Sequence, residues 1–410
     1  MPTIAAVVPR AAFTWVTARL RDEVSIPRIT SNRINTPEVA EDVLARGDAE
    51  LVSLARPLLA DPQFVRKAVE KRADEINTCI ACNQACLDHI FEGKIATCLV
   101  NPQAGRETEL VYRPCDTPKR IAVVGAGPAG LSCSDVAARR GHRVTLYDGR
   151  QRIGGQLNLA RRVPGKEEFD ETLRYFNRRL ELAGVQRVLG RFVKAEELAA
   201  EGYDAVVLAT GVVPRPISLP GGDRPTVVSY VDVLEGRVTV GRRAAIIGAG
   251  GIGFDVAEFL THPDEEAADP GLDFLRAWGV DRECRSAGGL LDAGPQVRPA
   301  AREVYLLQRS TTKVGAGLGK TTGWIHRATL RQRGVVMIAG VAYRQIDKLG
   351  LHITVEDEQR VLEVDHVVVC AGQEPLRDLE NGLNAAGIPF HLIGGARKAG
   401  GLDAQRAIAE

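Results

Sequence analysis

Short apolar runs alternate with longer amphipathic stretches along much of this chain, and the two patterns together predict an α/β fold. Runs such as 121–124, 205–209 and 244–247 are apolar at consecutive positions, and 144–147 is interrupted only by Thr145, which is typical of parallel strands buried on both faces. Glycines and then helical periodicity follow several of these runs. Strand, glycine turn and helix in this order predict parallel sheets with crossover helices.

The first 75 residues predict strand, helix, strand, helix. The predicted strands cover 24–33 and 50–56, and Thr36-Pro37 is a helix start that should run to Gly47. A further helix should begin at Asp61-Pro62. This order is that of a (βα)8 barrel, which needs about 250 residues when complete. The segment therefore predicts at most the last quarter of a barrel, so the remaining strands would have to come from elsewhere.

An arginine stands at the exit of each predicted barrel strand, Arg33 after the first and Arg56 after the second. Arginines at the C-terminal ends of barrel strands suit a phosphate site. The alternative is that both are solvated loop residues, and spacing alone leaves the two interpretations open.

A glycine fingerprint follows the run that begins at Lys119. Gly125, Gly127 and Gly130 lie between a strand and a helix, and Asp148 ends the next strand. The glycines permit a tight turn and close approach of a pyrophosphate, and the acid suits ribose hydroxyls. A second glycine turn at 153–156 is typical of FAD-binding chains, so we predict an FAD site here.

A second fingerprint consists of Gly248, Gly250 and Gly253. The expected second strand is delayed by 261–302, which we interpret as a surface loop with a short helix near FLRAWG. That strand ends in Gln308 and Arg309, with Lys313 nearby, and lacks an acid. Cations at this position suit a 2′-phosphate, which predicts NADPH in preference to NADH. The alternative is that Arg309 and Lys313 are solvated charges.

Four of the eight cysteines form the pattern C-x2-C-x3-C-x11-C, namely Cys79, Cys82, Cys86 and Cys98. Four thiolates suit an iron–sulfur cluster or zinc. Three ligands from one loop favour a [4Fe–4S] cluster over the paired knuckles of structural zinc. A disulfide pair is a weaker interpretation. Cys115, Cys133, Cys284 and Cys370 are interpreted as isolated packing or loop cysteines.

Composition restricts the partners. The chain carries 53 Lys+Arg and 52 Asp+Glu, which argues against a nucleic-acid or membrane partner recognised by bulk charge. No apolar run is long enough to cross a bilayer. The first residues lack a signal-peptide pattern, so we expect a cytoplasmic protein in which thiols stay reduced.

Several strings resemble the bacterial NADPH-dependent 2,4-dienoyl-CoA reductase family, whose relatives are trimethylamine dehydrogenase and the enoate reductases. The strings are TSNRINTPEVAEDVL, SLARPLLADP, INTCIACNQACLDHIF, CLVNP, GKEEF and GLGKTTGWIHR, and the resemblance covers essentially the whole chain. It implies electrons passing from NADPH to FAD, to a [4Fe–4S] cluster and to FMN, which reduces an unsaturated acyl-CoA thioester of fatty acid β-oxidation.

The resemblance also assigns cofactor contacts. Arg33, Ala55 and Arg56 would hold the FMN phosphate, and Ala129, Asp148, Gln156, Lys166 and Val193 would line FAD. The family's acid–base residues lie in the part of the barrel that this chain lacks, so no catalytic proton donor is assigned and FMN retention is in doubt. Ala396-Arg397 also replaces the family's usual acid beside the FAD ribityl chain.

The predicted fold is therefore a barrel remnant, an iron–sulfur segment and two Rossmann-like domains. The first function hypothesis is a reductase of the dienoyl-CoA type. The alternatives are a stand-alone NADPH–FAD–[4Fe–4S] electron-transfer module for a partner protein, and an inactive fragment. A partner chain could supply the rest of the barrel. The predicted boundaries are 1–75 for the barrel remnant, 76–118 for the cluster segment, 119–235 for the FAD domain, 236–375 for the NADPH domain, and 376–410 for the return to the FAD domain.

Overall fold

A computed structural model describes residues 4–263 and 267–410 and divides the chain into two compact units. One unit, called the cysteine unit below, consists of Phe13–Arg161, Glu167–Val213 and Gln373–Glu410. The other, called the second unit, consists of the residues up to Ala12 together with Arg162–Lys166 and Pro214–Gly372.

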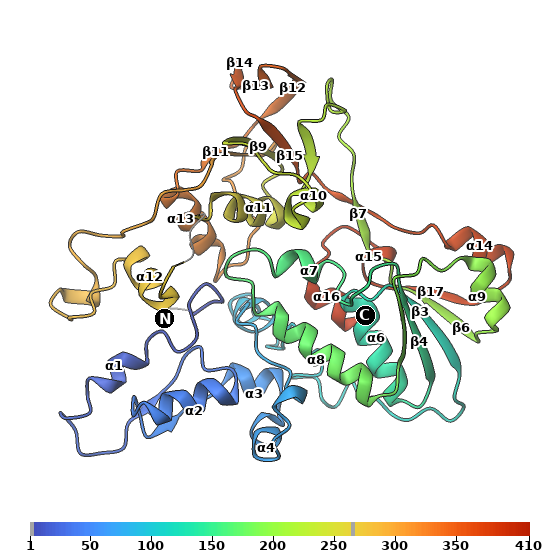
Figure 1. Cartoon of the computed structure of the whole chain (residues 1–410), viewed down its shortest axis with the longest axis horizontal. Coiled ribbons are helices and arrows are strands. Elements are labelled where there is room, and N and C mark those ends of the chain that lie inside the picture. Colours follow the sequence, from blue (N-terminus) through green and yellow to red (C-terminus); the bar gives the residue numbers. More distant parts are fainter. Residues whose placement is uncertain (1–3, 264–266) are drawn as a thin grey trace. The chain divides into compact units, whose positions relative to one another are not determined.

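A five-stranded parallel sheet forms the centre of the cysteine unit (Figure 1). Its strand order is β17-β6-β3-β4-β5, with bounds β3 Arg120–Val124, β4 Arg143–Asp148, β5 Gln186–Leu189, β6 Ala205–Leu208 and β17 Phe390–Leu392. Alternate residues of β3 face opposite sides, so Val123 joins one apolar cluster while Ala122 and Val124 join another. Both faces are therefore covered, as the continuous apolar runs predicted.

Helices cover the two faces of this sheet. Helix α6 (Pro128–Arg139) packs on β4, and α8 (Phe169–Leu182) packs on α6. Leu131 of α6 and Leu180 of α8 are fully buried in the same cluster as Val123. The remaining helices and short strands of this part are α7 Leu157–Ala160, α9 Ala195–Glu201, α14 Glu380–Ala385, α15 Gly394–Arg397 and α16 Ala404–Ala409, with β7 Val212–Pro214 pairing with β16 Gln373–Pro375.

The first part of the cysteine unit contains two parallel strands and four short helices. These are β1 Ile29–Thr30, β2 Leu51–Val52, α1 Thr14–Ala18, α2 Pro37–Ala45, α3 Arg56–Ala60 and α4 Phe64–Val69. The helix predicted from Thr36 is confirmed, because the Thr36 hydroxyl accepts the Val39 N–H. Both strands are much shorter than the predicted 24–33 and 50–56, and Ile29 and Leu51 are 60% and 51% exposed.

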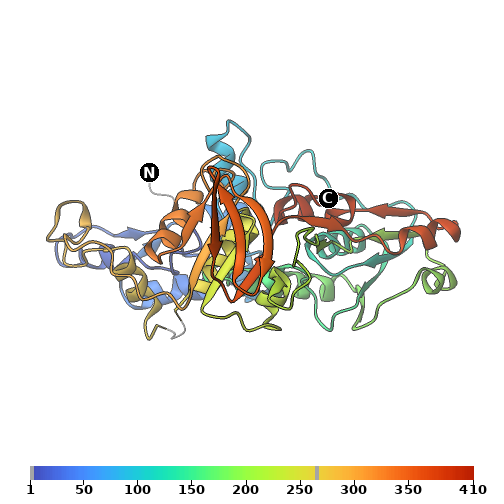
Figure 2. The ribbon, with the colours of Figure 1, turned by 90° about the horizontal axis from the view of Figure 1, so that it is seen from above.

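A second five-stranded parallel sheet organises the other unit, in the order β11-β10-β9-β15-β8. The strands are β8 Val227–Ser229, β9 Arg243–Ile247, β10 Glu303–Leu307, β11 Val336–Ile338 and β15 His366–Val369. A three-stranded antiparallel sheet, β12 Ala342–Asp347, β13 Gly350–Val355 and β14 Glu358–Leu362, packs against one face through Ile346, Leu351 and Ile353. Figure 2 shows these three strands side by side.

The helices of the second unit are α10 Tyr230–Glu235, α11 Gly251–Thr261, α12 Pro270–Ala277 and α13 Gly323–Gln332. Helix α12 lies in the predicted insertion, where Asp269 accepts the Leu272 N–H and Pro270 occupies the first turn. The short helix predicted near FLRAWG is thus present, although it begins earlier. None of the described helices is both long and apolar enough to traverse a bilayer.

Candidate functional site

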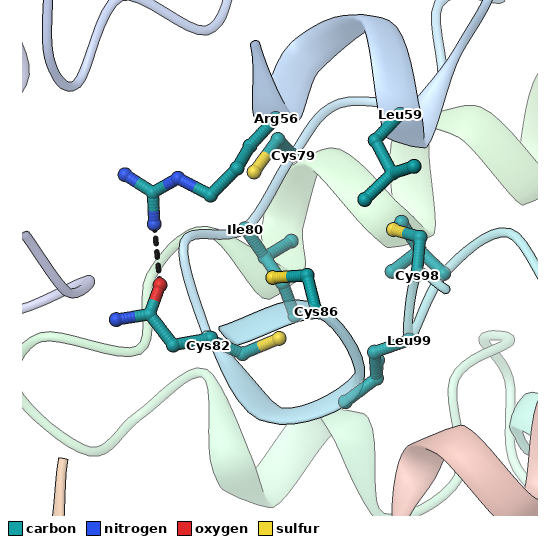
Figure 3. A pocket seen from close by; sticks show the side chains of 10 residues that line it. Arg56, Leu59, Cys79, Ile80, Cys82, Cys86, Cys98 and Leu99 are labelled. Carbon is teal, nitrogen blue, oxygen red and sulfur yellow. Dashed lines mark hydrogen bonds between the residues drawn. The ribbon is translucent and has the colours of Figure 1, made fainter. Parts of the chain in front are cut away.

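The four predicted ligand cysteines line a single cavity in the cysteine unit (Figure 3). Cys79 is buried, whereas Cys82, Cys86 and Cys98 are partly exposed. Apolar side chains complete most of the wall, and two polar residues, Arg56 and Asn83, also line it. The structure therefore brings together residues that span 79–98 in sequence around one small space.

The backbone of the cysteine loop is shaped so that amide groups reach the sulfurs. Ala81 and Asn83 adopt positive φ angles of 52° and 62°, and a single π-helical turn follows at Gln84–Asp88. Backbone N–H groups act on each sulfur, that of Ala81 on Cys79 and that of Gln84 on Cys82, with similar donors at Cys86 and Cys98. Hydrogen bonds to the charged form favour a thiolate, and consecutive N–H groups in such turns form anion-binding concavities.

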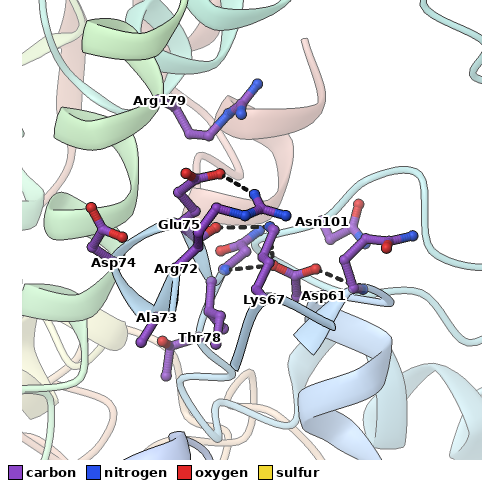
Figure 4. Close-up of polar contacts among 12 residues, drawn as sticks. Asp61, Lys67, Arg72, Ala73, Asp74, Glu75, Thr78, Asn101 and Arg179 are labelled. Atoms are coloured by element: carbon purple, nitrogen blue, oxygen red, sulfur yellow. Dashed lines mark hydrogen bonds and ion pairs between the residues drawn. The ribbon is translucent and has the colours of Figure 1, made fainter. Parts of the chain in front are cut away.

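A polar clamp holds the chain immediately before Cys79, and Figure 4 shows two of its members, Asp61 and Lys67. We define it as Asp61, Lys67, Asn77 and Arg174. The Asp61 carboxylate accepts bonds from the Asn77 N–H at 2.9 Å and from Lys67 Nζ at 2.6 Å. Arg174 of α8 donates to the Ile76 carbonyl at 2.7 Å and to the Thr78 hydroxyl at 3.0 Å. These contacts fix the entry to the loop.

The exit of the loop is tied to the same scaffold. Asn77 Nδ2 donates to the Val100 carbonyl at 2.8 Å, and Asn101 Nδ2 donates to the Leu59 carbonyl at 3.1 Å. Ile80, Ala85, Leu99 and Val100 belong to the same apolar cluster as the first face of the parallel sheet. Entry and exit are therefore anchored to the body of the unit.

Burial raises the pKa of all four thiols, to about 12 for Cys98. Repulsion by neighbouring thiolates raises the pKa of Cys79, Cys82 and Cys98 further, whereas the Arg56 guanidinium opposes the shift at Cys79 and Cys86. Binding of a cation at this place would therefore release protons. Among the described residues, no group of three or more His, Cys, Asp or Glu side chains is arranged to hold a metal ion.

The remaining four cysteines do not join this site. Cys115, Cys133 and Cys370 are free, like the four of the loop, and Cys284 is exposed. Burial raises the pKa of Cys133 to about 11, and it also raises that of Cys370. Both therefore remain protonated near neutral pH.

The residues assigned to FMN phosphate lie beyond the ends of β1 and β2. Arg33 is buried and its Nη2 is 2.8 Å from Glu168 Oε1, while Asn35 Nδ2 bridges the Cys79 carbonyl at 2.8 Å and Glu168 Oε2 at 3.0 Å. Ala55 is exposed and precedes the first turn of α3, where Arg56 begins the helix. Arg33 and Arg56 both influence Cys79, so this strand edge lies directly beside the cysteine cavity.

The first glycine fingerprint has the backbone that the sequence predicted. Gly125 has a φ of 111°, and a Cβ on Gly130 would lie 1.8 Å from the Gly125 carbonyl oxygen. Helix α6 starts after Gly127 and includes Ala129. The Asp148 carboxylate accepts the Ala126 N–H at 2.7 Å and the Arg150 N–H at 2.8 Å, so it lies beside the turn.

The other residues assigned to FAD are distributed between the two units. In the cysteine unit, Gln156 Nε2 donates to the Val212 carbonyl, and Gln156 Oε1 accepts from Gln373 Nε2, both at 3.4 Å. Val193 is buried in the apolar cluster of Val124 and Tyr147. Lys166 belongs to the second unit, where its ammonium contacts both oxygens of Asp255 at 2.6 and 2.7 Å.

The segment that lacks the usual acid forms the short helix α15. The Gly394 N–H donates to Glu410 Oε2 at 2.6 Å, and Arg397 pairs with the same carboxylate. Arg377 Nε donates to the Ala396 carbonyl at 2.6 Å. In this chain a carboxylate therefore reaches the backbone of this segment from Glu410, 16 positions after Gly394.

The second fingerprint repeats the first in the other unit. Gly248 has a φ of 109°, α11 begins after Gly250, and a Cβ on Gly253 would lie 1.9 Å from the Gly248 carbonyl oxygen. Arg309 and Lys313 are both exposed. Neither forms an ion pair within the described part of the chain, so both charges are available to an anion.

Sequence reasoning missed the side chains that organise these sites from a distance. Arg174, Glu168 and Asp255 act on residues about 90 or more positions away, and no local pattern identifies such a contact. Asn83 did carry a signal, because asparagine is enriched at positive φ. Its place between two ligand cysteines could have predicted the turn.

Two family models match this chain. The pyridine nucleotide-disulphide oxidoreductase model matches residues 119–396. The model described as NADH:flavin oxidoreductase / NADH oxidase family matches residues 3–75. The cysteine segment lies between the two matched regions.

Individual proteins match over nearly the full chain. A metal reductase from Desulforamulus reducens is 33% identical over 405 residues, covering 97% of this chain and 59% of that protein. The structure of a 2-naphthoyl-CoA reductase complex is 26% identical, with a TM-score of 0.85 over 100% of this chain and 57% of that chain. Histamine dehydrogenase from Rhizobium sp. 4-9 shares the fold, with a TM-score of 0.79 and 20% identity over 99% of this chain and 58% of that one.

The chain spans somewhat more than half the length of these relatives. Its longer match covers both nucleotide-binding sheets, and its shorter match covers the parallel strand pair with Arg33 and Arg56. The chain belongs to the pyridine nucleotide-disulphide oxidoreductase family, whose model matches more than half of its length.

Proposed function

We propose that this chain is the electron-input portion of an NADPH-dependent flavin and iron–sulfur oxidoreductase of the 2,4-dienoyl-CoA reductase type. One observation carries the proposal. Cys79, Cys82, Cys86 and Cys98 line a single cavity that lies between a parallel strand pair and a Rossmann-type sheet. In the proposal, this cavity holds an electron carrier that connects the two flavin-binding regions.

The cavity suits a [4Fe–4S] cluster by the chemistry of its donors. Four cysteine sulfurs form the ligand set of such clusters, and backbone N–H groups reach each sulfur in the way that stabilises thiolates. Such a cluster, when bound, carries one electron at a time. The clamp residues hold the loop in place, and the apolar wall of Ile80, Leu59 and Leu99 limits the access of water.

The flavin and coenzyme sites follow from the two glycine fingerprints. In the proposal, the first turn and Asp148 hold the FAD dinucleotide, and the second turn with Arg309 and Lys313 holds NADPH. FAD held at the first turn would supply the conversion of a two-electron donor, NADPH, into single electrons. Arg33 and Arg56 lie at the strand edge where an FMN phosphate would bind, provided that further strands complete the barrel.

The substrate class proposed is a conjugated, unsaturated acyl thioester, a 2,4-dienoyl-CoA. The resemblance of the sequence motifs supports this class, as does the likeness to a protein named 2-naphthoyl-CoA reductase. Exposed Ile29 and Leu51 favour completion of the strand pair by further strands, because uncovered parallel strands are rare. The described residues therefore pass electrons, and the reduction of the thioester belongs to the completed barrel.

Metal analysis tests the central part of the proposal. Protein prepared anaerobically should contain about four iron atoms and acid-labile sulfide. Cys82→Ser should lose most of the iron, whereas Cys284→Ser, which changes an exposed cysteine outside the loop, should retain it. Stoichiometric zinc without sulfide in the unaltered protein would refute the cluster.

Flavin analysis tests the division between the two flavins. We expect this chain alone to bind FAD, to retain little FMN, to pass electrons from NADPH to a dye, and to leave 2,4-dienoyl-CoA unreduced. Flavins are extracted and separated, and consumption of the thioester is measured. Equimolar FMN together with turnover of dienoyl-CoA by this chain alone would contradict the expected need for further strands.

A further inference from the structure

One large apolar side chain near the first glycine turn is almost completely open to solvent. Phe192 is 86% exposed, more than any other large apolar side chain in the part of the chain that the structure describes. Single exposed apolar residues are common on protein surfaces, so exposure by itself indicates no function. Two features separate this ring from an ordinary surface residue, namely the backbone that supports it and its place in the sheet.

The ring of Phe192 rests on a residue that has no side chain. Gly149 directly follows β4, and a Cβ on Gly149 would lie within 2.7 Å of three carbon atoms of the ring. Carbon atoms in contact are about 3.5–4.0 Å apart, so any other residue at 149 would displace the ring. The next residue along the chain, Val193, is buried with Val124 and Tyr147. Phe192 is therefore held in place while most of its surface stays open.

Phe192 lies beyond the carboxyl-terminal ends of two parallel strands. Strands β4 and β5 end in register, with Asp148 opposite Leu189. Beyond these ends, the Arg191 N–H donates to the Asp148 carbonyl at 3.1 Å. The chain that carries Phe192 is thus tied to the end of β4. In open α/β sheets, ligands bind outside the carboxyl ends of the strands, so the exposed ring lies at the edge where a ligand is expected.

The same edge contains the turn that is proposed to hold FAD. The Asp148 carboxylate accepts the N–H of Ala126, a residue of the first glycine turn, at 2.7 Å. In dinucleotide sites of this kind, the glycine turn binds the pyrophosphate and the acid after the second strand binds a ribose. The base is attached to that ribose, so it must lie close to Asp148. Gly149 and the ring of Phe192 are the next features of the edge.

We propose that Phe192 is a stacking platform for the adenine base of FAD held at the first glycine turn. This rests on the proposed function, since it requires that the first turn binds FAD. A purine has a flat face that stacks on an aromatic side chain without any particular hydrogen bond. Because Gly149 and Val193 already hold the ring in place, little conformational freedom is lost when a base covers it. The resemblance assigns Val193 to FAD and gives Phe192 no role.

The test measures FAD binding to the full chain after its flavin has been removed, with flavin fluorescence as the signal. Phe192→Ala should raise the Kd for FAD at least about fivefold, the lower end of the effect of removing an aromatic partner from a stacked base. Phe192→Tyr keeps the ring and should bind FAD within about twofold of the unaltered chain. Leu182→Ala is the control, because it removes an exposed apolar side chain near the start of β5 rather than its end.

A second ligand separates stacking from a general disturbance of the loop. Flavin cytosine dinucleotide keeps the flavin and both phosphates but replaces the purine by a single-ring base. The smaller base makes fewer contacts with the ring, so Phe192→Ala should weaken its binding less than that of FAD. Circular dichroism checks that each variant is folded. An unchanged Kd for FAD in Phe192→Ala, equal losses for the two ligands, or a loss in Phe192→Tyr as large as that in Phe192→Ala would overturn the proposal.

The same titrations distinguish this proposal from the function on which it rests. If the unaltered chain binds no FAD, the flavin part of the proposed function fails. If the unaltered chain binds FAD and Phe192→Ala binds it equally well, only the stacking role of Phe192 fails.

Discussion

The two parallel sheets of this chain arrange their strands in the same way around two different dinucleotide sites. In the cysteine unit β3 is flanked by β4 and β6, and in the second unit β9 is flanked by β10 and β15. The Gly125 N–H donates to the Tyr147 carbonyl at 2.8 Å, and the Gly248 N–H donates to the Leu307 carbonyl at 2.9 Å. Asp148 and Gln308 are therefore equivalent positions, each just past the aligned strand residue.

The difference between the sheets lies in that equivalent position. The Asp148 carboxylate accepts two backbone N–H groups beside the turn. The Gln308 amide instead donates to the Ser310 carbonyl at 3.0 Å, and exposed Arg309 follows. In the proposed function, one backbone frame would hold both cofactors, and the residues after the second strand would decide whether a free hydroxyl or a phosphate is accommodated.

Adding a methyl group to either turn should have the largest effect. Gly130→Ala would place Cβ 1.8 Å from the Gly125 oxygen, so we expect at least tenfold weaker FAD binding. Gly253→Ala would place Cβ 1.9 Å from the Gly248 oxygen, and should keep FAD but lose its reduction by NADPH. Flavin content, circular dichroism and reduction by NADPH or dithionite are measured. Each variant is the other's control, and full FAD retention by Gly130→Ala would contradict the steric argument.

Reversing the charge after β10 should have the next largest effect. Arg309→Glu replaces a cation by a group that repels a 2′-phosphate, so the Kd for NADPH should rise about tenfold or more, in line with the strength of charged hydrogen bonds. The Kd for NADH should change little. Arg331→Glu alters an exposed arginine of α13 in the same unit and should leave both constants unchanged. Equal affinity of the unaltered protein for both coenzymes would refute the assignment.

Replacing Asp148 by glutamine, the residue at the equivalent position Gln308, should have a moderate effect. Asp148→Gln removes the charge from a side chain that accepts two N–H groups. We expect severalfold weaker FAD binding and a decrease of about 1 kcal/mol in the free energy of unfolding of the FAD-free protein. Flavin titration and denaturant unfolding measure the two effects. The matched control is Asp204→Asn, because Asp204 accepts the Arg120 N–H at the opposite end of the sheet; it should leave FAD affinity unaltered.

Removing the thiol of Cys370, whose backbone carbonyl faces the second turn, should have the smallest effect. The carbonyl of Ala209 faces Gly125, and the carbonyl of Cys370 faces Gly248, so Cys370→Ala makes the two turns alike. Burial raises the pKa of this thiol, which keeps it protonated and unreactive. The Kd for NADPH should stay within about twofold by calorimetry, since only one buried sulfur is lost. A large loss would assign Cys370 a direct role at the coenzyme.

The sequence predicted the elements whose cause is local. The glycine turns, the Thr36 cap and the acid at Asp148 depend on backbone conformation and short-range hydrogen bonds, and the structure has all of them. The predicted strands 24–33 and 50–56 shrink to β1 and β2. Apolar runs specify a tendency to extend, whereas strand length depends on which partners are present to pair with.

The sequence allowed the candidate ligand cysteines to be predicted, but not the distant side chains that hold the loop and Arg33 in place. Cysteine spacing identified the four sulfurs, and the structure brings them to one cavity. Arg174 and Glu168 belong to the segment of α8, and nothing in their local pattern indicates contact with 73–79 or Arg33. Sequence reasoning also assigned Arg56 to a phosphate alone, because its contact with Asn83 depends on a left-handed turn 27 residues later.

The polar clamp has a consequence for the biogenesis of the holoprotein. Arg174 reaches back 98 residues to the Ile76 carbonyl, so the entry to the cysteine loop is ordered only once α8 has formed and docked. Long-range closure of this kind is slow and comes late in folding. In the proposed function, a cluster would therefore bind to a chain in which α8 has already docked, through the partly exposed sulfurs of Cys82, Cys86 and Cys98.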